Sequence, residues 1–222
     1  SLPEKIFKKI LEQYNKNEIY HNVINHMKKV IEQNIDLSTV DYISGGERRD
    51  WFFSNIISYL LHKPHLTIYK DLSIVCSDSE FTSTKPISDL NGKSVLHIAD
   101  LVTVASSYIR AWIPAIKAIN GNMKYSCVVV DRMQGGREKI EAEGVNFYSL
   151  INVDDSLFEM AYKKGIINEN QLEMLKGFFK NPDETMKQFL INHPEFLENA
   201  LNSNEKTRKR AKLLVDGNLY GL

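Results

Sequence analysis

The spacing of hydrophobic and polar positions divides the chain into three stretches. From Leu2 to about Asn34, apolar residues recur every three or four positions, which predicts one broken helix or two. From residue 38 to about 150, short continuous apolar runs alternate with amphipathic segments. After about Asn152 only the helical spacing remains, and it predicts a run of short helices that open at Asp, Asn or Pro residues.

The middle stretch predicts an α/β fold. Because its strands are Val- and Ile-rich runs separated by helices, we expect a mostly parallel sheet with helices on both faces. The polar residues 78–88 are predicted to form a mobile loop. The expected domains are an α/β domain with N-terminal helices at residues 1–151 and an all-helical C-terminal region at residues 152–222. The expected strands cover residues 38–44, 65–71, 72–77, 93–100, 124–131 and 145–150, and the expected helices cover residues 51–63, 106–120 and 136–144.

Composition and charge exclude several classes of protein. The 222 residues carry a formal net charge of zero, which argues against nucleic acid or an anionic membrane as a partner. No apolar run reaches the roughly 20 residues that span a bilayer. The N-terminus has no apolar signal segment, and Cys76 and Cys127 lack zinc-site spacing, so we expect a cytoplasmic protein. The basic segment KTRKRAK is interpreted as a solvated helix end or a dimer contact, with nucleic-acid binding as the minor alternative.

Three polar loops follow three of the predicted strands. In an open parallel sheet, ligands bind at the carboxyl ends of the strands, so these loops are expected to share one crevice. The first loop, GGERRD, begins at Gly45 and carries Arg48 and Arg49, whose guanidinium groups suit phosphate. An equally good interpretation is that Glu47, Arg48 and Asp50 pair with one another and open the following helix.

The second loop, DLVTVASS, begins at Asp100. The hydroxyls of Thr103, Ser106 and Ser107 lie beside the amides of a helix start, which favours an anion, although serine and threonine are also common helix caps. Asp100 could bind sugar hydroxyls or a hydrated metal, or it could only cap the helix. The sequence leaves these alternatives open.

The third loop, DRMQGG, places Asp131 and Arg132 directly after a buried strand. Arg132 could face a planar anionic base, or it could form an ordinary salt bridge. His97 alternates with apolar neighbours on its strand, so we interpret it as a hydrogen-bonded core residue and not as a catalytic one.

Two segments, KSVLHIADLVTVASS and CVVVDRMQGGREKIEAEGVNFYSL, together resemble the type I phosphoribosyltransferases, and specifically the orotate phosphoribosyltransferases. In that family a strand ending in two acids leads into a turn that holds the 5′-phosphate of phosphoribosyl pyrophosphate. The Asp-Arg pair, the Gln, the glycines and the Glu-containing helix are typical of the orotate enzymes. The resemblance covers about residues 41–150, and it implies a phosphoribosyltransferase-like fold, Mg²⁺ bound with phosphoribosyl pyrophosphate, orotate as the base, and a homodimer.

The resemblance also implies roles for individual residues. Asp100 matches the acid that contacts the ribose hydroxyls, and Arg132 matches the arginine that binds orotate. Lys70 matches a lysine that reaches the pyrophosphate, and with Asp100 and Arg48 it forms the implied catalytic set. The implied phosphate turn is Thr103, Val104, Ala105, Ser106 and Ser107, and the implied pyrophosphate loop is Gly45, Gly46, Glu47, Arg48 and Arg49.

Several positions depart from the family pattern. Ala99 replaces the first acid of the strand end, and Tyr69 and Ser73 replace two cations of the pyrophosphate segment. Val104 and Ala105 stand where the turn usually has Thr or Ala and then Gly. The N-terminal segment that contacts orotate in the family is missing.

The sequence therefore predicts a phosphoribosyltransferase-like protein that transfers the phosphoribosyl group to orotate through a partly degenerate motif. The alternative is a weak or inactive homologue that binds phosphoribosyl pyrophosphate or a nucleotide as a sensor. A third interpretation is a scaffold whose helical region binds a protein partner.

Overall fold

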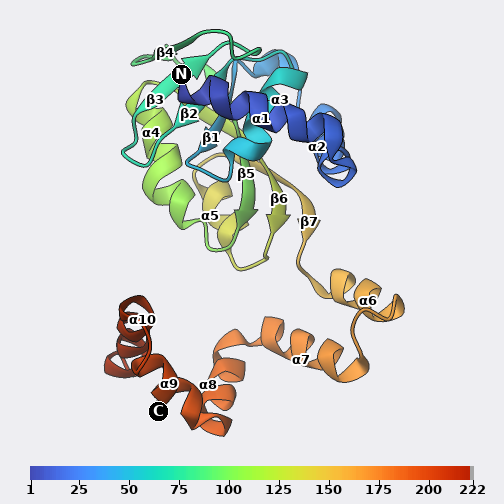
Figure 1. The fold of residues 1–222 in the computed structure, drawn as a ribbon, viewed down its shortest axis with the longest axis vertical. Helices are drawn as coiled ribbons and strands as arrows, with labels where there is room; N and C mark the ends of the chain where they lie inside the picture. Colours follow the sequence, from blue (N-terminus) through green and yellow to red (C-terminus); the bar gives the residue numbers. More distant parts are fainter. Residues whose placement is uncertain (221–222) are drawn as a thin grey trace. The chain divides into compact units, whose positions relative to one another are not determined.

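A computed structural model describes residues 1–220 of the chain (Figure 1). The chain divides into two compact units, Ser1–Val153 and Asp154–Leu222. The first unit contains the sheet, and the second consists of helices. Within residues 1–220, none of the helices has the length and apolarity that a membrane crossing requires.

A seven-stranded sheet forms the centre of the first unit, with the strand order β4-β3-β2-β1-β5-β6-β7. The parallel strands are β1 (Tyr42–Gly46), β2 (His65–Ile68), β5 (Ser94–Val102), β6 (Asn122–Asp131) and β7 (Asn146–Asn152). Two short strands, β3 (Ile74–Ser77) and β4 (Thr84–Pro86), add an antiparallel edge. The predicted fold class, a mostly parallel sheet with helices, is confirmed.

Helices cover both faces of this sheet because its central strands are apolar on both sides. Along β5, Val95 and Ala99 belong to one core cluster, and Leu96 and Ile98 belong to the other. The cluster around Leu96 contains residues of α1 (Leu2–Lys16), α2 (Glu18–Asn34) and α3 (Trp51–Leu60). The cluster around Val95 contains residues of the π-helical turn η2 (Tyr108–Trp112), α4 (Ile113–Ala118) and α5 (Gly136–Ala142). The N-terminal stretch is two helices, since Asn17 ends α1 and its side chain caps α2.

Two expectations for local structure are wrong in part. The segment expected as a strand at residues 38–44 begins with a 3-10 turn, η1 (Leu37–Thr39), because the Asp36 side chain accepts a hydrogen bond from the amide of Ser38. The strand itself starts only at Tyr42. The polar stretch 78–88 contains β4, in which Lys85 pairs with Cys76 of β3. That pairing depends on a neighbouring strand and leaves no mark in the composition of the loop.

The second unit consists of helices, and it follows the predicted start residues closely. The side chains of Asp154, Asn168, Asn181 and Asn204 each accept a hydrogen bond from an amide of the helix that follows. Such N-caps satisfy backbone donors that would otherwise have no partner at the helix start. The helices are α6 (Asp155–Lys163), α7 (Glu169–Lys180), α8 (Pro182–Asn192), α9 (Pro194–Leu201) and α10 (Glu205–Asp216).

Candidate functional site

A pocket of about 270 Å³ lies at the carboxyl ends of β1 and β5, which are neighbours in the sheet. Its walls come from the loop after β1 and from the loop after β5, so the expected meeting of these two loops is confirmed. The lining residues after β1 are Glu47, Arg48, Arg49 and Asp50. Those from the end of β5, the turn after it and the start of the next helical segment are Ala99, Asp100, Leu101, Val102, Thr103, Ala105, Ser106, Ser107, Tyr108 and Trp112.

The first loop is held against the sheet at its start. Gly46 lies under the indole of Trp112, and a Cβ at this glycine would stand 2.3 Å from Trp112 Cε2, so only glycine fits. The Glu47 amide donates to the carbonyl of Ile68, and the Glu47 carboxylate accepts from the amide of Lys70 at 3.0 Å. The loop is thereby tied to the end of β2, while the side chains of Arg48 and Arg49 are exposed.

Arg49 and Asp100 form an ion pair across the pocket, with Arg49 Nε 3.1 Å from Asp100 Oδ2. The Arg49 side chain is 73% exposed, and the Asp100 side chain is 21% exposed. Partial burial and the nearby Asp50 carboxylate raise the pKa of Asp100, and Arg49 opposes this rise. The pocket lining therefore includes two exposed guanidinium groups and three carboxylates, those of Glu47, Asp50 and Asp100.

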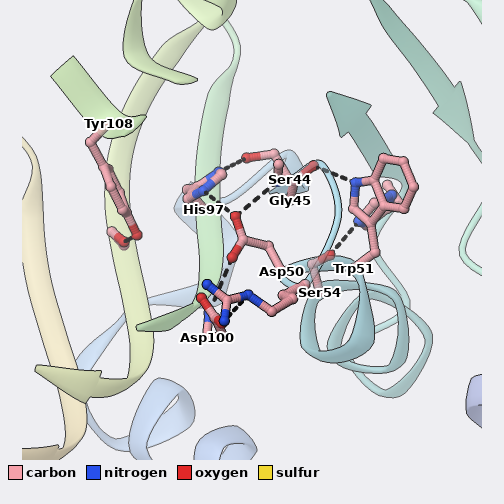
Figure 2. A network of polar contacts seen from close by, with 12 residues as sticks. Ser44, Gly45, Asp50, Trp51, Ser54, His97, Asp100 and Tyr108 are labelled. Carbon is pink, nitrogen blue, oxygen red and sulfur yellow. Dashed lines mark hydrogen bonds and ion pairs between the residues drawn. The ribbon is translucent and has the colours of Figure 1, made fainter. Parts of the chain in front are cut away.

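A buried polar network lies behind Asp100 and joins the two loops (Figure 2). The carboxylate of Asp50 accepts hydrogen bonds from the amides of Gly46 and Asp100, each at 3.2 Å. His97 Nε2 stands 3.7 Å from Asp50 Oδ2, and His97 Nδ1 lies 2.9 Å from Ser44 Oγ. Glu47, Arg48 and Asp50 form no ion pair with one another within residues 1–220, and the Asp50 side chain does not cap α3.

The turn after β5 leads into a helical segment that starts at Ser106. The exposed Ser106 and Ser107 and the half-buried Thr103 line the pocket. Ala105 adopts φ of 59°, a left-handed conformation in which a Cβ is strained. The glycine that is usual in this turn would relieve that strain, so the departure at Ala105 has a conformational cost.

Replacing Ala105 by glycine is expected to leave the free energy of unfolding nearly unchanged. Relief of the left-handed strain, about 1–2 kcal/mol, offsets the lost burial of one methyl group and the greater freedom of glycine in the unfolded chain. The control is Ala115→Gly in α4, which relieves no strain and is expected to lower stability by about 1–2 kcal/mol. Urea denaturation measures both free energies of unfolding. Equal losses of stability in the two variants would show that the backbone at Ala105 is not strained.

The third loop does not reach this pocket. Asp131 is fully buried, where it accepts from the amide of Met133 and pairs with Arg137 Nε at 3.1 Å. Arg137 also donates to Ser149 Oγ of β7, so the acid at the end of β6 holds the start of α5 against β7.

Five of the predicted site residues are not among the pocket's lining residues in the described part of the chain: Gly45, Gly46, Lys70, Val104 and Arg132.

Sequence reasoning missed three features of the site. Asp50 is expected from the sequence to open the following helix and to pair with its loop neighbours, yet its carboxylate connects the two loops. Tyr108 and Trp112 fall within the helix expected at residues 106–120 and were given no role, but both line the pocket. His97 was interpreted as a fully hydrogen-bonded core residue, and it is buried, but its Nε2 has no hydrogen-bond partner within residues 1–220. An acid directly after two arginines in a glycine loop was the only available signal.

Comparison with known proteins first defines the fold. No family model matches the chain. The crystal structure of orotate phosphoribosyltransferase from Francisella tularensis superposes with a TM-score of 0.57 at 17% identity, covering 75% of this chain and 81% of that one. The parallel sheet with its helices is therefore the fold of the phosphoribosyltransferases.

The curated relatives then identify the closer resemblance. Orotate phosphoribosyltransferase of Sulfolobus acidocaldarius is 23% identical over 128 residues, which is 57% of this chain and 60% of that enzyme. Orotate phosphoribosyltransferase of Sulfurisphaera tokodaii is 25% identical over 163 residues, which is 72% of this chain and 77% of the relative. The chain thus spans less than two thirds of the length of the first relative. The predicted similarity to the orotate members of the type I phosphoribosyltransferases is confirmed.

Proposed function

We propose that the protein transfers a phosphoribosyl group from phosphoribosyl pyrophosphate to orotate. The observation that carries the proposal is the pocket between the loops of β1 and β5, which brings Arg48, Arg49 and Asp100 to the hydroxyl-bearing turn. Guanidinium groups suit a pyrophosphate, and the turn at a helix start suits a monophosphate. A carboxylate between them is placed to accept hydrogen bonds from sugar hydroxyls.

Arg132 and Lys70 have proposed roles that the pocket itself does not include. Arg132 follows β6, the strand beside β5, and it binds the base under this proposal. Lys70 follows β2, on the other side of β1, and its amide is bound by Glu47 of the first loop. Both residues follow strands that neighbour β1 or β5, and the proposal requires that they reach the bound substrate. The proposal includes a homodimer, in keeping with the resemblance.

Magnesium is part of the proposal because phosphoribosyl pyrophosphate carries a pyrophosphate. Mg²⁺ keeps several waters and typically uses one or two carboxylates together with substrate phosphates. Within residues 1–220, no three or more His, Cys, Asp or Glu side chains form a group suited to a metal. The partly exposed Asp100 fits a hydrated ion that is held mainly by the substrate. When bound, the ion supplies charge neutralisation for the departing pyrophosphate.

The proposal is tested by calorimetry with phosphoribosyl pyrophosphate and Mg²⁺, followed by orotate and an assay for orotidylate. Binding of phosphoribosyl pyrophosphate and formation of orotidylate are the expected results. Binding without any orotidylate would favour the second candidate, a sensor for phosphoribosyl pyrophosphate or a nucleotide. Ala99 is the observation that favours the sensor, since it lines the pocket where a first acid is usual. No binding at all would overturn both candidates.

Replacing Asp100 by asparagine is expected to weaken phosphoribosyl pyrophosphate binding by about tenfold, because one carboxylate hydrogen bond is worth about 1–3 kcal/mol.

The free energy of unfolding of Asp100→Asn at neutral pH should not fall below that of the wild-type protein. The raised pKa means that Asp100 stabilises the folded chain when protonated, and this contribution is lost as the pH rises through that pKa. Thermal melts and calorimetry measure the two effects, and an unchanged affinity would leave Asp100 with no role in binding.

A further inference from the structure

The Asp50 side chain is used in an unusual way for its position. Asp50 stands immediately before α3, where an aspartate commonly caps the helix, but its carboxylate makes no hydrogen bond to α3. Instead, Oδ2 accepts from the amide of Gly46 and Oδ1 accepts from the amide of Asp100. One carboxylate thus bridges the loop after β1 and the end of β5.

The burial of this carboxylate requires compensation. Asp50 is only 8% exposed, and a buried charge is costly unless polar groups surround it. The two amides supply part of that compensation, and His97 Nε2 stands 3.7 Å from Oδ2. This distance is too long for a hydrogen bond, yet Asp50 is the acidic group that the nitrogen faces.

The surroundings of His97 fix how it faces Asp50. His97 is fully buried, and its ring packs edge-on against Tyr108 with 5.0 Å between ring centroids. Its Nδ1 contacts the hydroxyl of Ser44 on β1. When Nδ1 accepts from that hydroxyl, the proton is on Nε2, the ring nitrogen that stands 3.7 Å from Asp50 Oδ2. Ser44, His97 and Asp50 therefore form one buried line across β1, β5 and the start of α3 (Figure 2).

A negative charge here is electrostatically unfavourable for a pocket that takes an anion. The ionised Asp50 repels phosphate, and it also raises the pKa of the neighbouring Asp100. The charge therefore helps such a site only through the groups it positions. Those groups are the loop that carries Arg48 and Arg49, and the carboxylate of Asp100.

We propose that Asp50 is a positioning residue, which His97 and Ser44 support and which fixes the arginine loop and Asp100 at the separation that a phosphorylated ligand needs. This inference rests on the proposed function, because it assumes that the pocket binds phosphoribosyl pyrophosphate. It goes beyond that proposal by assigning a role to Asp50, which lines the pocket, and to the fully buried Ser44 and His97.

The test compares Asp50→Asn and Ser44→Ala with the control Ser58→Ala. Ser58 is also fully buried on α3, but its hydroxyl donates to the carbonyl of Lys63 at the far end of that helix. The first measurement is the amide nitrogen–proton spectrum without ligand. Asp50→Asn should shift the Gly46 and Asp100 resonances, Ser44→Ala should shift them less, and Ser58→Ala should leave them in place.

The second measurement is calorimetry with inorganic pyrophosphate. Loss of positioning predicts that Asp50→Asn binds about tenfold more weakly, whereas removal of a repelling charge alone predicts equal or tighter binding. Ser44→Ala gives a second reading if Asp50→Asn does not fold, and it should weaken binding in the same direction. Equal or tighter binding in either folded variant overturns the inference and leaves the proposed function intact. A wild-type protein that binds neither pyrophosphate nor phosphoribosyl pyrophosphate overturns the proposed function and the positioning role with it. If the Gly46 and Asp100 amide resonances do not move in Asp50→Asn, the link that Asp50 makes between these amides is overturned whatever the binding result.

Discussion

Replacing Arg48 by alanine is expected to lower kcat/KM for phosphoribosyl transfer to orotate by about 10²-fold or more. Arg48 is exposed in the pocket wall, and within residues 1–220 it forms no ion pair, so its charge is available to the departing pyrophosphate. Negative charge builds up on that group mainly in the transition state, where the loss of a charge contact costs a few kcal/mol. The affinity for phosphoribosyl pyrophosphate should therefore fall less than the rate.

Arg49 gives an informative comparison, because its Nε is already 3.1 Å from Asp100. Arg49→Ala should also lower turnover, but it removes a partner of Asp100 as well, so we expect a larger effect on affinity than Arg48→Ala produces. Arg208→Ala, an exposed arginine of α10, is the matched control and should leave turnover unchanged. Full activity in Arg48→Ala, or equal falls in rate and affinity, would show that Arg48 does not act on the leaving group.

Replacing Gly46 by alanine is expected to destabilise the first unit by about 1–3 kcal/mol, the usual cost of overpacking. The added Cβ would lie 2.3–2.8 Å from three atoms of the Trp112 ring, which is buried and has little room to move. The substitution also disturbs the loop whose amide binds Asp50, so ligand binding should weaken with stability. Urea denaturation followed by tryptophan fluorescence measures the change, because Trp51 and Trp112 are the two tryptophans of the chain and both lie in the first unit.

The matched control for this substitution is Gly177→Ala in α7. Apart from the adjoining residues and backbone of its own helix, no heavy atom lies within 4 Å of the position where its Cβ would be, and its helical conformation favours alanine. The tryptophan transition should stay where it is, since Gly177 belongs to the second unit. If Gly46→Ala is as stable as the wild-type protein, the contact between the loop and Trp112 is not as close as the structure has it.

The elements of the core could be predicted from the sequence because each depends on a local pattern. Continuous apolar runs such as SVLHIA give β5, whose residues enter both core clusters. In the second unit, the N-cap residues Asp154, Asn168 and Asn204 start their helices where expected. The edge strand β4 was missed because its polar residues form a strand only through pairing with β3. The location of the pocket was predicted from the rule that ligands bind at the carboxyl ends of parallel strands.

The sequence by itself determined the α/β pattern, the meeting of two of the three expected loops at the sheet edge and the similarity to orotate phosphoribosyltransferases. Only the tertiary structure decided how the charged groups of those loops pair. Asp131 is bound by Arg137 and not by its neighbour Arg132, and Asp50 turns away from its own helix toward the amides of Gly46 and Asp100. The physical reason is that a buried carboxylate binds whichever donors the fold brings within hydrogen-bond distance, and those donors lie 4 and 50 residues from Asp50 along the chain.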